Sequence, residues 1–226
     1  MTAPEPDRAS AAQAFYSRWA PGYDRLATHA PGIRRLRTAL VDGLDPAPGD
    51  TVVDIGCGTG ATLPYLRDRV GSEGTVVGVD FAPGALTRAR ARIDRAGWEN
   101  VTVCRGDGTR LPLRTADAVA ASFLMGMLPD PAATVENWLA TLDPDRVALL
   151  DLARSYRLPG RAINPLFRLA VRASSPPGTA AHHGESPTQV LDRRVAAAHR
   201  TVLGACAETT HETRLGGFAY LSAGRR

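Results

Sequence analysis

The sequence predicts an α/β protein with a Rossmann-like, doubly wound sheet of about seven strands, mostly parallel and ending in an antiparallel C-terminal hairpin. Between residues 51 and 152, short apolar segments rich in β-branched residues alternate with helical segments, which is typical of βαβ units. A glycine-rich loop joins the first of these strands to the following helix. Near the C-terminus, only Gly216 and Gly217 separate two strand-like segments, which indicates a hairpin.

The parallel part of the sheet is expected to contain five short strands, each apolar enough to be buried on both faces. These strands are residues 51–55, 74–80, 101–105, 117–122 and 146–152. The helices expected between them are residues 59–70, 83–96 and 131–142. Because crossovers between parallel strands are right-handed, these helices are expected on both faces of the sheet.

The remaining segments lie before and after this alternating region. After it, the expected elements are helices 162–172 and 187–203 and hairpin strands 207–215 and 218–223. Before it, the expected elements are helices 11–28 and 31–43 and a Pro/Gly-rich linker at 45–50. We therefore divide the chain into an N-terminal helical segment, residues 1–45, and a single domain, residues 46–226.

Composition limits the class of protein. The chain has 226 residues, of which 44% are hydrophobic and 22% charged, so one domain with an ordinary core is expected. Its net charge is +4, but the basic residues are all arginines and are scattered, so we expect no nucleic-acid partner. The three cysteines are widely spaced and form no cluster with histidines, which indicates neither disulfides nor a metal site and favours a cytoplasmic protein. The N-terminus has no apolar signal region, and no apolar run is long enough to span a membrane.

The strongest functional signal is the loop after the first strand. Its sequence is Asp54-Ile55-Gly56-Cys57-Gly58-Thr59-Gly60. The glycines let a ligand approach the main chain, and the next helix offers free N–H groups. Asp80 ends the second strand, where a carboxylate can accept two hydrogen bonds from a ribose diol. Together they predict an adenosine-type cofactor. Since Gly56, Gly58 and Ala61 also fit the dinucleotide pattern, a nicotinamide cofactor stays open at this point.

Further residues bear on which cofactor binds. Asp54 lies two residues before Gly56, where a dehydrogenase usually has an apolar residue, and a carboxylate there can face a cationic cofactor. Asp107 follows the third strand and can accept a hydrogen bond from an adenine amino group. The chain has no lysine, so it lacks the Tyr-x-x-x-Lys pair of many oxidoreductases. These residues favour S-adenosylmethionine (SAM) over a nicotinamide.

Four motifs in order resemble those of the class I SAM-dependent methyltransferases. They are residues 53–60, 78–80, 106–108 and 117–123. Residues 15–24 resemble the N-terminal segment of the ubiquinone/menaquinone C-methyltransferase-like branch, which implies that residues 1–45 form a helical cap over the cofactor. The resemblance implies SAM as cofactor and S-adenosylhomocysteine as product. The loop pattern and the resemblance together assign cofactor binding to Tyr23, Asp54, Gly56, Gly58, Thr59, Gly60, Asp80, Phe81, Asp107, Gly108 and Ser122.

The expected activity is methyl transfer to a small-molecule or lipid-like acceptor: a quinone, a phospholipid headgroup or a secondary metabolite. The quinone enzymes carry a polar run after the fourth motif, whereas residues 124–127 here are Leu-Met-Gly-Met, and the sequence after Asp151 also differs. Both differences fall near the expected acceptor pocket, so the acceptor is left open and no catalytic residue is assigned. The alternatives are an NAD(P)-dependent oxidoreductase and a non-catalytic SAM-binding protein.

Residues 161–172 form a short basic amphipathic pattern. Apolar residues share one helical face, and Arg161, Arg168 and Arg172 share another. Three interpretations are open: a helix packed on the core, a lid for a lipid-like substrate, or a weak peripheral contact with an anionic membrane. The oligomeric state, monomer or dimer, is not indicated by the sequence.

Overall fold

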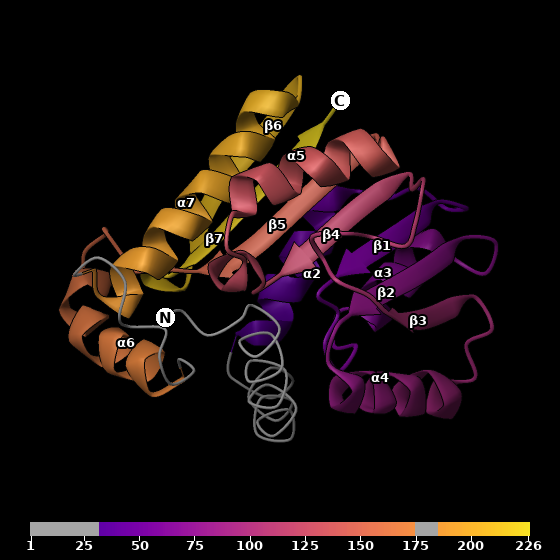
Figure 1. The fold of residues 1–226 in the computed structure, drawn as a ribbon, viewed down its shortest axis with the longest axis horizontal. Coiled ribbons are helices and arrows are strands. Elements are labelled where there is room, and N and C mark those ends of the chain that lie inside the picture. The colour runs from indigo at the N-terminus through magenta and orange to yellow at the C-terminus, as the bar shows by residue number, and fades with distance from the viewer. Residues whose placement is uncertain (1–31, 175–184) are drawn as a thin grey trace, which may run out of the picture.

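The computed structural model describes residues 32–174 and 185–226, and its centre is a seven-stranded sheet in the order β3-β2-β1-β4-β5-β7-β6 (Figure 1). The strands are β1 (Thr51–Ile55), β2 (Thr75–Asp80), β3 (Val101–Arg105), β4 (Ala118–Ser122), β5 (Arg146–Leu152), β6 (Glu208–Arg214) and β7 (Ala219–Arg225). The first five pair in parallel, whereas β7 pairs antiparallel with both β5 and β6. The predicted sheet and its C-terminal hairpin are confirmed.

Helices cover both faces of this sheet. They are α2 (Ile33–Leu44), α3 (Leu63–Val70), α4 (Pro83–Ala96), α5 (Pro131–Leu142), α6 (Gly160–Ser174) and α7 (Pro187–Ala205), with short 3₁₀ turns η1 (Met125–Met127) and η2 (Leu215–Gly217). Residues of α2, α3 and α4 form one buried cluster with the sheet, and residues of α5 and α7 form the other. In Figure 1, α6 lies at the end of the sheet, outside these two layers.

Strand alternation explains why the core has two parts. Val52 and Val53 are neighbours in β1 and are both fully buried. Because successive side chains point to opposite faces of a strand, Val52 packs with α2 and α3, whereas Val53 packs with α5 and α7. On α3, Leu63, Leu66 and Val70 are fully buried and cover the first face, as their helical spacing predicts.

The helix expected from residue 59 begins later, at Leu63, and the expected start is therefore wrong. Gly60 has a φ of +75°, which no helix interior accommodates, so the glycine loop extends further than its sequence pattern indicated. Other helix starts follow local chemistry. The Asp130 side chain accepts a hydrogen bond from the Ala133 N–H at the start of α5, and Ser186 and Gln189 form a capping box on α7.

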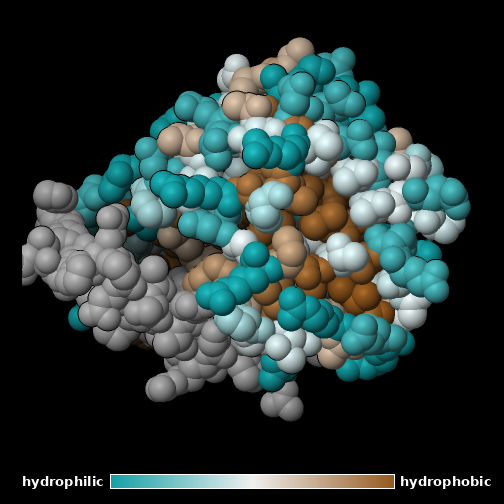
Figure 2. Space-filling model, turned by 45° about the vertical axis from the view of Figure 1, so that its right-hand side comes forward, coloured by the Kyte–Doolittle hydropathy of each residue, from teal (hydrophilic) through white to brown (hydrophobic). Residues whose placement is uncertain are grey.

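The loop from β3 to β4 contains no helix, so the sheet is covered there by loop side chains. Leu111 and Leu113 are partly buried against the cluster of α5 and α7. Figure 2 shows hydrophobic side chains reaching the surface among polar ones on the face that it presents. Within the described ranges, no helix combines the length and apolarity needed to cross a membrane.

Because β1 to β5 are parallel, their carboxyl ends meet at one edge of the sheet. We call it the C-terminal edge. Ligands of open α/β sheets bind there. The start of β7 lies at the same edge, since Ala219 pairs with Leu152. The expected helix 11–28 and most of the expected N-terminal cap lie outside the described residues, which include only α2 of that segment.

Candidate functional site

The glycine loop lies at the C-terminal edge between β1 and α3. Gly56, Gly58 and Gly60 all have positive φ, at 72°, 55° and 75°, a backbone conformation that favours glycine. The loop is tied to the neighbouring strand because the N–H groups of Gly56 and Cys57 both donate to the Val79 carbonyl, at 2.8 and 3.1 Å. A β-carbon on Gly58 would meet nothing within 4 Å. The loop is therefore fixed to β2 by these hydrogen bonds and leaves open space at Gly58.

Asp80 joins this loop to the end of β2. Its Oδ2 accepts a hydrogen bond from the Gly58 N–H at 2.9 Å, and its Oδ1 accepts one from the Ala82 N–H at 2.8 Å. Burial raises the pKa of Asp80, while backbone N–H groups, including that of Phe81, act in the opposite direction. Each carboxylate oxygen has a second lone pair, so this fixed carboxylate can still accept hydrogen bonds from ribose hydroxyls.

Asp54 is the penultimate residue of the strand β1, two residues before Gly56, and is fully buried. Among the residues that the structure describes, neither of its carboxylate oxygens has a hydrogen-bond partner. Its pKa is raised from 3.8 to about 7, mainly by burial, with Arg37 acting to lower it and Asp80 acting to raise it. A buried carboxylate without hydrogen bonds is costly, and a cationic ligand would lower that cost.

Arg37 is a site residue that the sequence interpretation missed. It belongs to α2, is only 4% exposed, and is the cation that lowers the pKa of Asp54. Its guanidinium carbon lies 5.6 Å from the centroid of the Phe123 ring, a cation–π distance. Phe123 itself has a φ of +58°, unusual for a residue other than glycine. The helical sequence pattern of α2 predicts only that Arg37 lies in a helix. Its role could not be predicted, because Asp54 and Phe123 are distant from it in the sequence.

The loop after β3 carries Asp107 and Gly108. Oδ1 of Asp107 accepts hydrogen bonds from the N–H and the hydroxyl of Thr109, both at 2.8 Å, so one carboxylate oxygen already organises a turn. The indole N–H of Trp138 donates to the Gly108 carbonyl at 2.6 Å, and Asn137 donates to the Thr109 carbonyl at 3.1 Å. Helix α5 therefore holds this loop, a role that the sequence pattern did not reveal.

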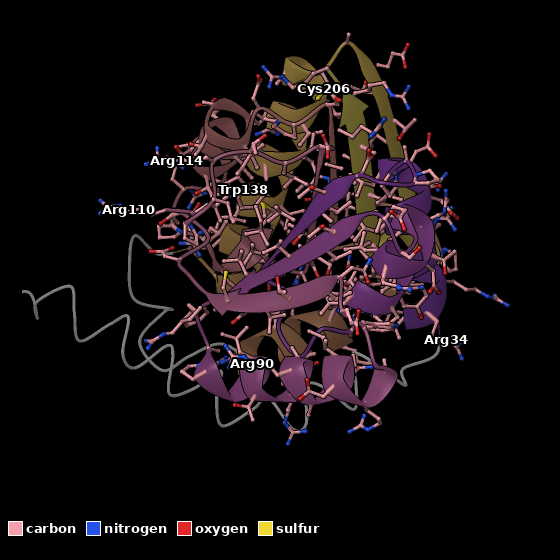
Figure 3. All side chains as sticks on the ribbon, turned by 90° about the vertical axis from the view of Figure 1, so that its right-hand side faces the viewer. Arg34, Arg90, Arg110, Arg114, Trp138 and Cys206 are labelled. Carbon is pink, nitrogen blue, oxygen red and sulfur yellow. The ribbon has the colours of Figure 1, made fainter. Side chains whose placement is uncertain are left out.

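Figure 3 shows how this loop is arranged. Trp138 lies inward between α5 and the sheet, and it is fully buried. Arg110 and Arg114, from the same loop, point away from the body of the molecule. The loop thus presents its backbone, rather than its arginines, toward the edge of the sheet.

The ends of β4 and the glycine loop are brought together by small side chains. The hydroxyls of Ser122 and Thr62 lie 3.4 Å apart. Thr59 is buried, and its carbonyl accepts a hydrogen bond from Arg92 Nε of α4 at 3.2 Å. A β-carbon on Gly56 would come within 3.0 Å of Leu124, so the loop packs closely on the segment after β4.

A second buried carboxylate, Asp151, lies one residue before the end of β5, near the expected acceptor side. Its Oδ1 accepts a hydrogen bond from the Met125 N–H at 3.0 Å, and its Oδ2 lies 3.3 Å from His199 Nε2. His199 Nδ1 lies 2.8 Å from the Ser222 hydroxyl, which lies 2.8 Å from His211 Nδ1. Burial raises the pKa of Asp151, and its contacts with His199 oppose that shift. This closed network fixes η1: Met125 is buried in the core, whereas Met127 is 43% exposed at the edge.

Two other groups of residues carry little chemistry here. Cys57 is buried, and burial raises the pKa of its thiol well above the ordinary value, so the thiolate needed for a nucleophile is disfavoured. Within residues 32–174 and 185–226, no three His, Cys, Asp or Glu side chains are grouped so that they would hold a metal ion.

Tyr23 lies outside the described residues, and its predicted contact with the cofactor stays a prediction.

The structure brings the other predicted cofactor residues to one edge. They are Asp54, Gly56, Gly58, Thr59, Gly60, Asp80, Phe81, Asp107, Gly108 and Ser122. The arrangement fits SAM in its chemistry: a pinned carboxylate at Asp80 suits a ribose, the loop at Gly58 leaves room for close approach, and the unpartnered carboxylate of Asp54 suits a positively charged methionine moiety. A neutral or anionic group beside Asp54 would not offset its charge.

Comparisons with known proteins agree with this geometry. Residues 52–145 match the family model described as a methyltransferase domain. Nocamycin O-methyltransferase from Saccharothrix syringae is 35% identical over 170 residues, which cover 71% of this chain and 61% of that protein. A 2-phytyl-1,4-naphtoquinone methyltransferase from Thermosynechococcus vestitus is 33% identical over 146 residues, which cover 62% of this chain and 64% of that protein.

Solved structures share the fold. A SAM-dependent methyltransferase from Aquifex aeolicus superposes with a TM-score of 0.59 and 19% identity, covering 94% of this chain and 97% of that one. By contrast, the chain spans somewhat under two thirds of the length of the two curated relatives, at 61% and 64%. The family model matches residues 52–145, the part of the chain that builds the glycine loop and its neighbours.

Proposed function

We propose that this protein, which belongs to the class I SAM-dependent methyltransferases, transfers the methyl group of SAM to a small-molecule or lipid-like acceptor. The observation that carries this proposal is Asp54, a fully buried carboxylate with no hydrogen-bond partner in the described part of the chain. Its position at the end of β1, beneath a loop that leaves space at Gly58, calls for a cationic ligand. SAM is an adenosine cofactor with such a charge, whereas a nicotinamide dinucleotide would bring its anionic pyrophosphate to this loop.

Each part of the edge has its own task in this proposal. Asp80 holds the ribose hydroxyls, the backbone at Gly58 approaches the cofactor closely, and Asp54 faces its positive methionine end. The loop at Asp107 and Gly108 borders the adenine, supported by Trp138. When bound, SAM supplies an electrophilic methyl group on a sulfonium.

The protein's own contribution is alignment and exclusion of water. Holding two reactants in the reactive geometry supplies roughly 7–11 kcal/mol in favourable systems. The Asp151 network fixes η1 and so shapes the side of the edge where an acceptor would lie. We assign no general base, since an acceptor without a proton to lose needs none.

The acceptor is proposed to be a small or lipid-like molecule because the surface beside the site is apolar. Met127, in the 3₁₀ turn η1 after β4, is 43% exposed, and the buried side chain of Leu124 packs against Gly56. The names of the two curated relatives, a nocamycin O-methyltransferase and a naphthoquinone methyltransferase, support the same class. Free cysteines at positions 57, 104 and 206 support action in a reducing compartment such as the cytoplasm.

A thermal-shift comparison tests the cofactor. A ligand at ~100 times its dissociation constant adds roughly 2.7 kcal/mol of stability, a rise of roughly 5–10 °C for a chain of this size. We expect this rise with SAM and S-adenosylhomocysteine and none with NADH. Asp80→Ala should abolish it, whereas Asp94→Ala, at an exposed position on α4, should retain it.

The opposite results separate the alternatives. A shift with NADH and none with SAM would establish the oxidoreductase instead. Tight binding of SAM without methyl transfer to any component of lipid or metabolite extracts, followed with isotope-labelled SAM, would favour a non-catalytic binding protein. Labelled products identify the acceptor directly.

A further inference from the structure

Exposed large hydrophobic side chains are gathered at one edge of the part of the molecule that the structure describes. They are Met127, Tyr156, Leu158, Ile163, Leu166, Leu169 and Leu215. They belong to the segments that follow β4 and β5 and to the turn between β6 and β7. All three segments lie at the C-terminal edge, which also holds the candidate cofactor site. Exposed apolar side chains gathered at one edge indicate an interaction surface, unlike single exposed leucines scattered over a protein.

Helix α6 contributes the largest share of this surface and is attached to the protein along one side only. Asn164 exchanges two hydrogen bonds with the backbone of Ser155, at 3.0 and 2.9 Å. One turn further, the Phe167 ring packs on Phe218 with ring centroids 5.2 Å apart. These contacts fix the orientation of the helix, so the direction in which its other side chains point is determined by the fold.

A second side of α6 is apolar and faces outward. Ile163, Leu166 and Leu169 are 51%, 66% and 64% exposed. Their spacing of three residues places them along one stripe of the helix, next to the stripe that carries Asn164 and Phe167. The interpretation of residues 161–172 as a helix packed on the core is therefore wrong for Ile163 and Leu166, which point outward together with Leu169.

The remaining side of α6 is basic. Arg161, Arg168 and Arg172 are exposed, share one face by helical spacing, and have no carboxylate partner in the described ranges. From residue 152 to residue 184 the sequence contains five arginines and no Asp or Glu. An apolar stripe and a cationic stripe thus run side by side along the exposed half of the helix.

We propose that α6 docks the C-terminal edge of the protein onto an anionic lipid bilayer. The stripe of Ile163, Leu166 and Leu169 would enter the boundary between headgroups and acyl chains, and the three arginines would contact lipid phosphates. A bilayer surface matches both stripes at once, because it is negative at the headgroup level and apolar just below. A helix of 15 residues with three arginines binds such a surface weakly and reversibly.

This docking places the candidate site next to the bilayer. Met127, in the turn after β4, and Leu215, in the turn between β6 and β7, are exposed apolar residues at the same C-terminal edge as α6. The site edge would then face the lipid, which would give an amphiphilic molecule a short path to it. The docking itself requires neither SAM nor a methyl acceptor, so it is tested separately from the proposed activity.

Flotation with vesicles tests the proposal. The full chain is mixed with vesicles of phosphatidylcholine alone or of phosphatidylcholine with phosphatidylglycerol, and the bound fraction is measured at low and high salt. We expect binding to the anionic vesicles only, weakened by salt. The triple variant Arg161→Gln, Arg168→Gln, Arg172→Gln should lower the partition coefficient on the order of 100-fold. The double variant Leu166→Gln, Leu169→Gln should lower it at least ~10-fold.

A matched control removes the same number of charges elsewhere. Arg88, Arg90 and Arg95 are exposed on α4, so their triple replacement by Gln should leave vesicle binding within about two-fold of the wild type. All replaced side chains are exposed, and unchanged far-UV circular dichroism confirms that each variant is folded. The proposal would be contradicted if the α6 variants bound the anionic vesicles as well as the wild type does. It would also be contradicted if the α4 variant lost as much vesicle binding as the α6 variants. A wild-type protein that binds neither kind of vesicle would also contradict it. So would a sedimentation-velocity result showing that the wild type forms dimers through the stripe of Ile163, Leu166 and Leu169.

Discussion

Asp54 and Asp151 are buried carboxylates near the carboxyl ends of β1 and β5, and they differ in how their charges are satisfied. Each is the penultimate residue of a parallel strand at the same edge, each is at most 2% exposed, and burial raises the pKa of each. Asp151 is enclosed by the Met125 N–H and by His199. Asp54 has no hydrogen-bond partner in the described part of the chain.

The difference separates a structural carboxylate from a ligand-binding one. A buried polar group that is fully hydrogen-bonded rigidifies the fold around it, as Asp151 does for η1. A buried polar group left open is tolerated where function requires it, because the cost is recovered when a ligand binds. Removing Asp151 should therefore damage stability, whereas removing Asp54 should damage binding.

The largest effect is expected from Asp151→Ala. The change leaves the Met125 N–H and His199 without their shared acceptor, which costs about 3 kcal/mol of unfolding free energy. Urea unfolding followed by circular dichroism measures this loss. Asp151→Asn keeps an acceptor oxygen for Met125 and should cost less than half as much. SAM affinity of the folded Asp151→Ala protein should stay within about three-fold of the wild type; a loss of affinity without a loss of stability would break the comparison.

The opposite behaviour is expected from Asp54→Asn. The folded wild type holds a proton on Asp54 up to about pH 7, whereas the unfolded chain releases it near 3.8, so the folded state binds more protons between these values. Stability of the ligand-free wild type therefore falls as pH rises through this window. Asn does not titrate, so the variant should be more stable than the wild type at pH 8, by about 1–2 kcal/mol, and the gap should close toward pH 5.

Binding of SAM should change in the other direction. The wild type should bind more tightly as pH rises through about 7, because the ionised carboxylate of Asp54 faces a cation. Asp54→Asn should weaken binding on the order of ten-fold at pH 8 and flatten this pH dependence. Calorimetric titration at several pH values measures both effects. An unchanged affinity at every pH would show that Asp54 does not face the cofactor.

The features of this protein that follow local sequence patterns could be predicted from its sequence. The strands and most helices follow local patterns of period 2 and 3.6, so their order and the hairpin at Gly216 and Gly217 are confirmed. The resemblance to methyltransferases is also visible locally, because the glycine loop and Asp80 lie close together in the sequence, within the residues 52–145 that match the methyltransferase-domain model. Local patterns failed at the start of α3, where the positive φ of Gly60 extends the loop to Thr62.

The rest of the site depends on contacts between distant segments, which no local pattern reveals. Arg37 reaches the neighbourhood of Asp54 only because α2 packs on the face of the sheet formed by β4, β5 and β7. His199 meets Asp151 across 48 positions of sequence, and Trp138 meets Gly108 across 30. The outward direction of Leu166 and Leu169 is likewise set by the docking of Phe167, since an amphipathic pattern alone is equally typical of a buried helix.

The smallest effect is expected from Trp138→Phe. This substitution tests whether SAM binding at the loop that carries Asp107 and Gly108 depends on the support of that loop by α5. The change removes the indole N–H that donates to the Gly108 carbonyl and keeps an aromatic ring in the core, so stability should fall by about 1–2 kcal/mol. If the loop at Asp107 and Gly108 borders the adenine, its loosening should weaken SAM binding about three-fold. Asn137→Ala, which removes the neighbouring contact to Thr109, should weaken it less, because that contact is exposed. An affinity unchanged in Trp138→Phe would restrict cofactor recognition to the glycine loop, Asp54 and Asp80, and would leave the loop after β3 as part of the scaffold.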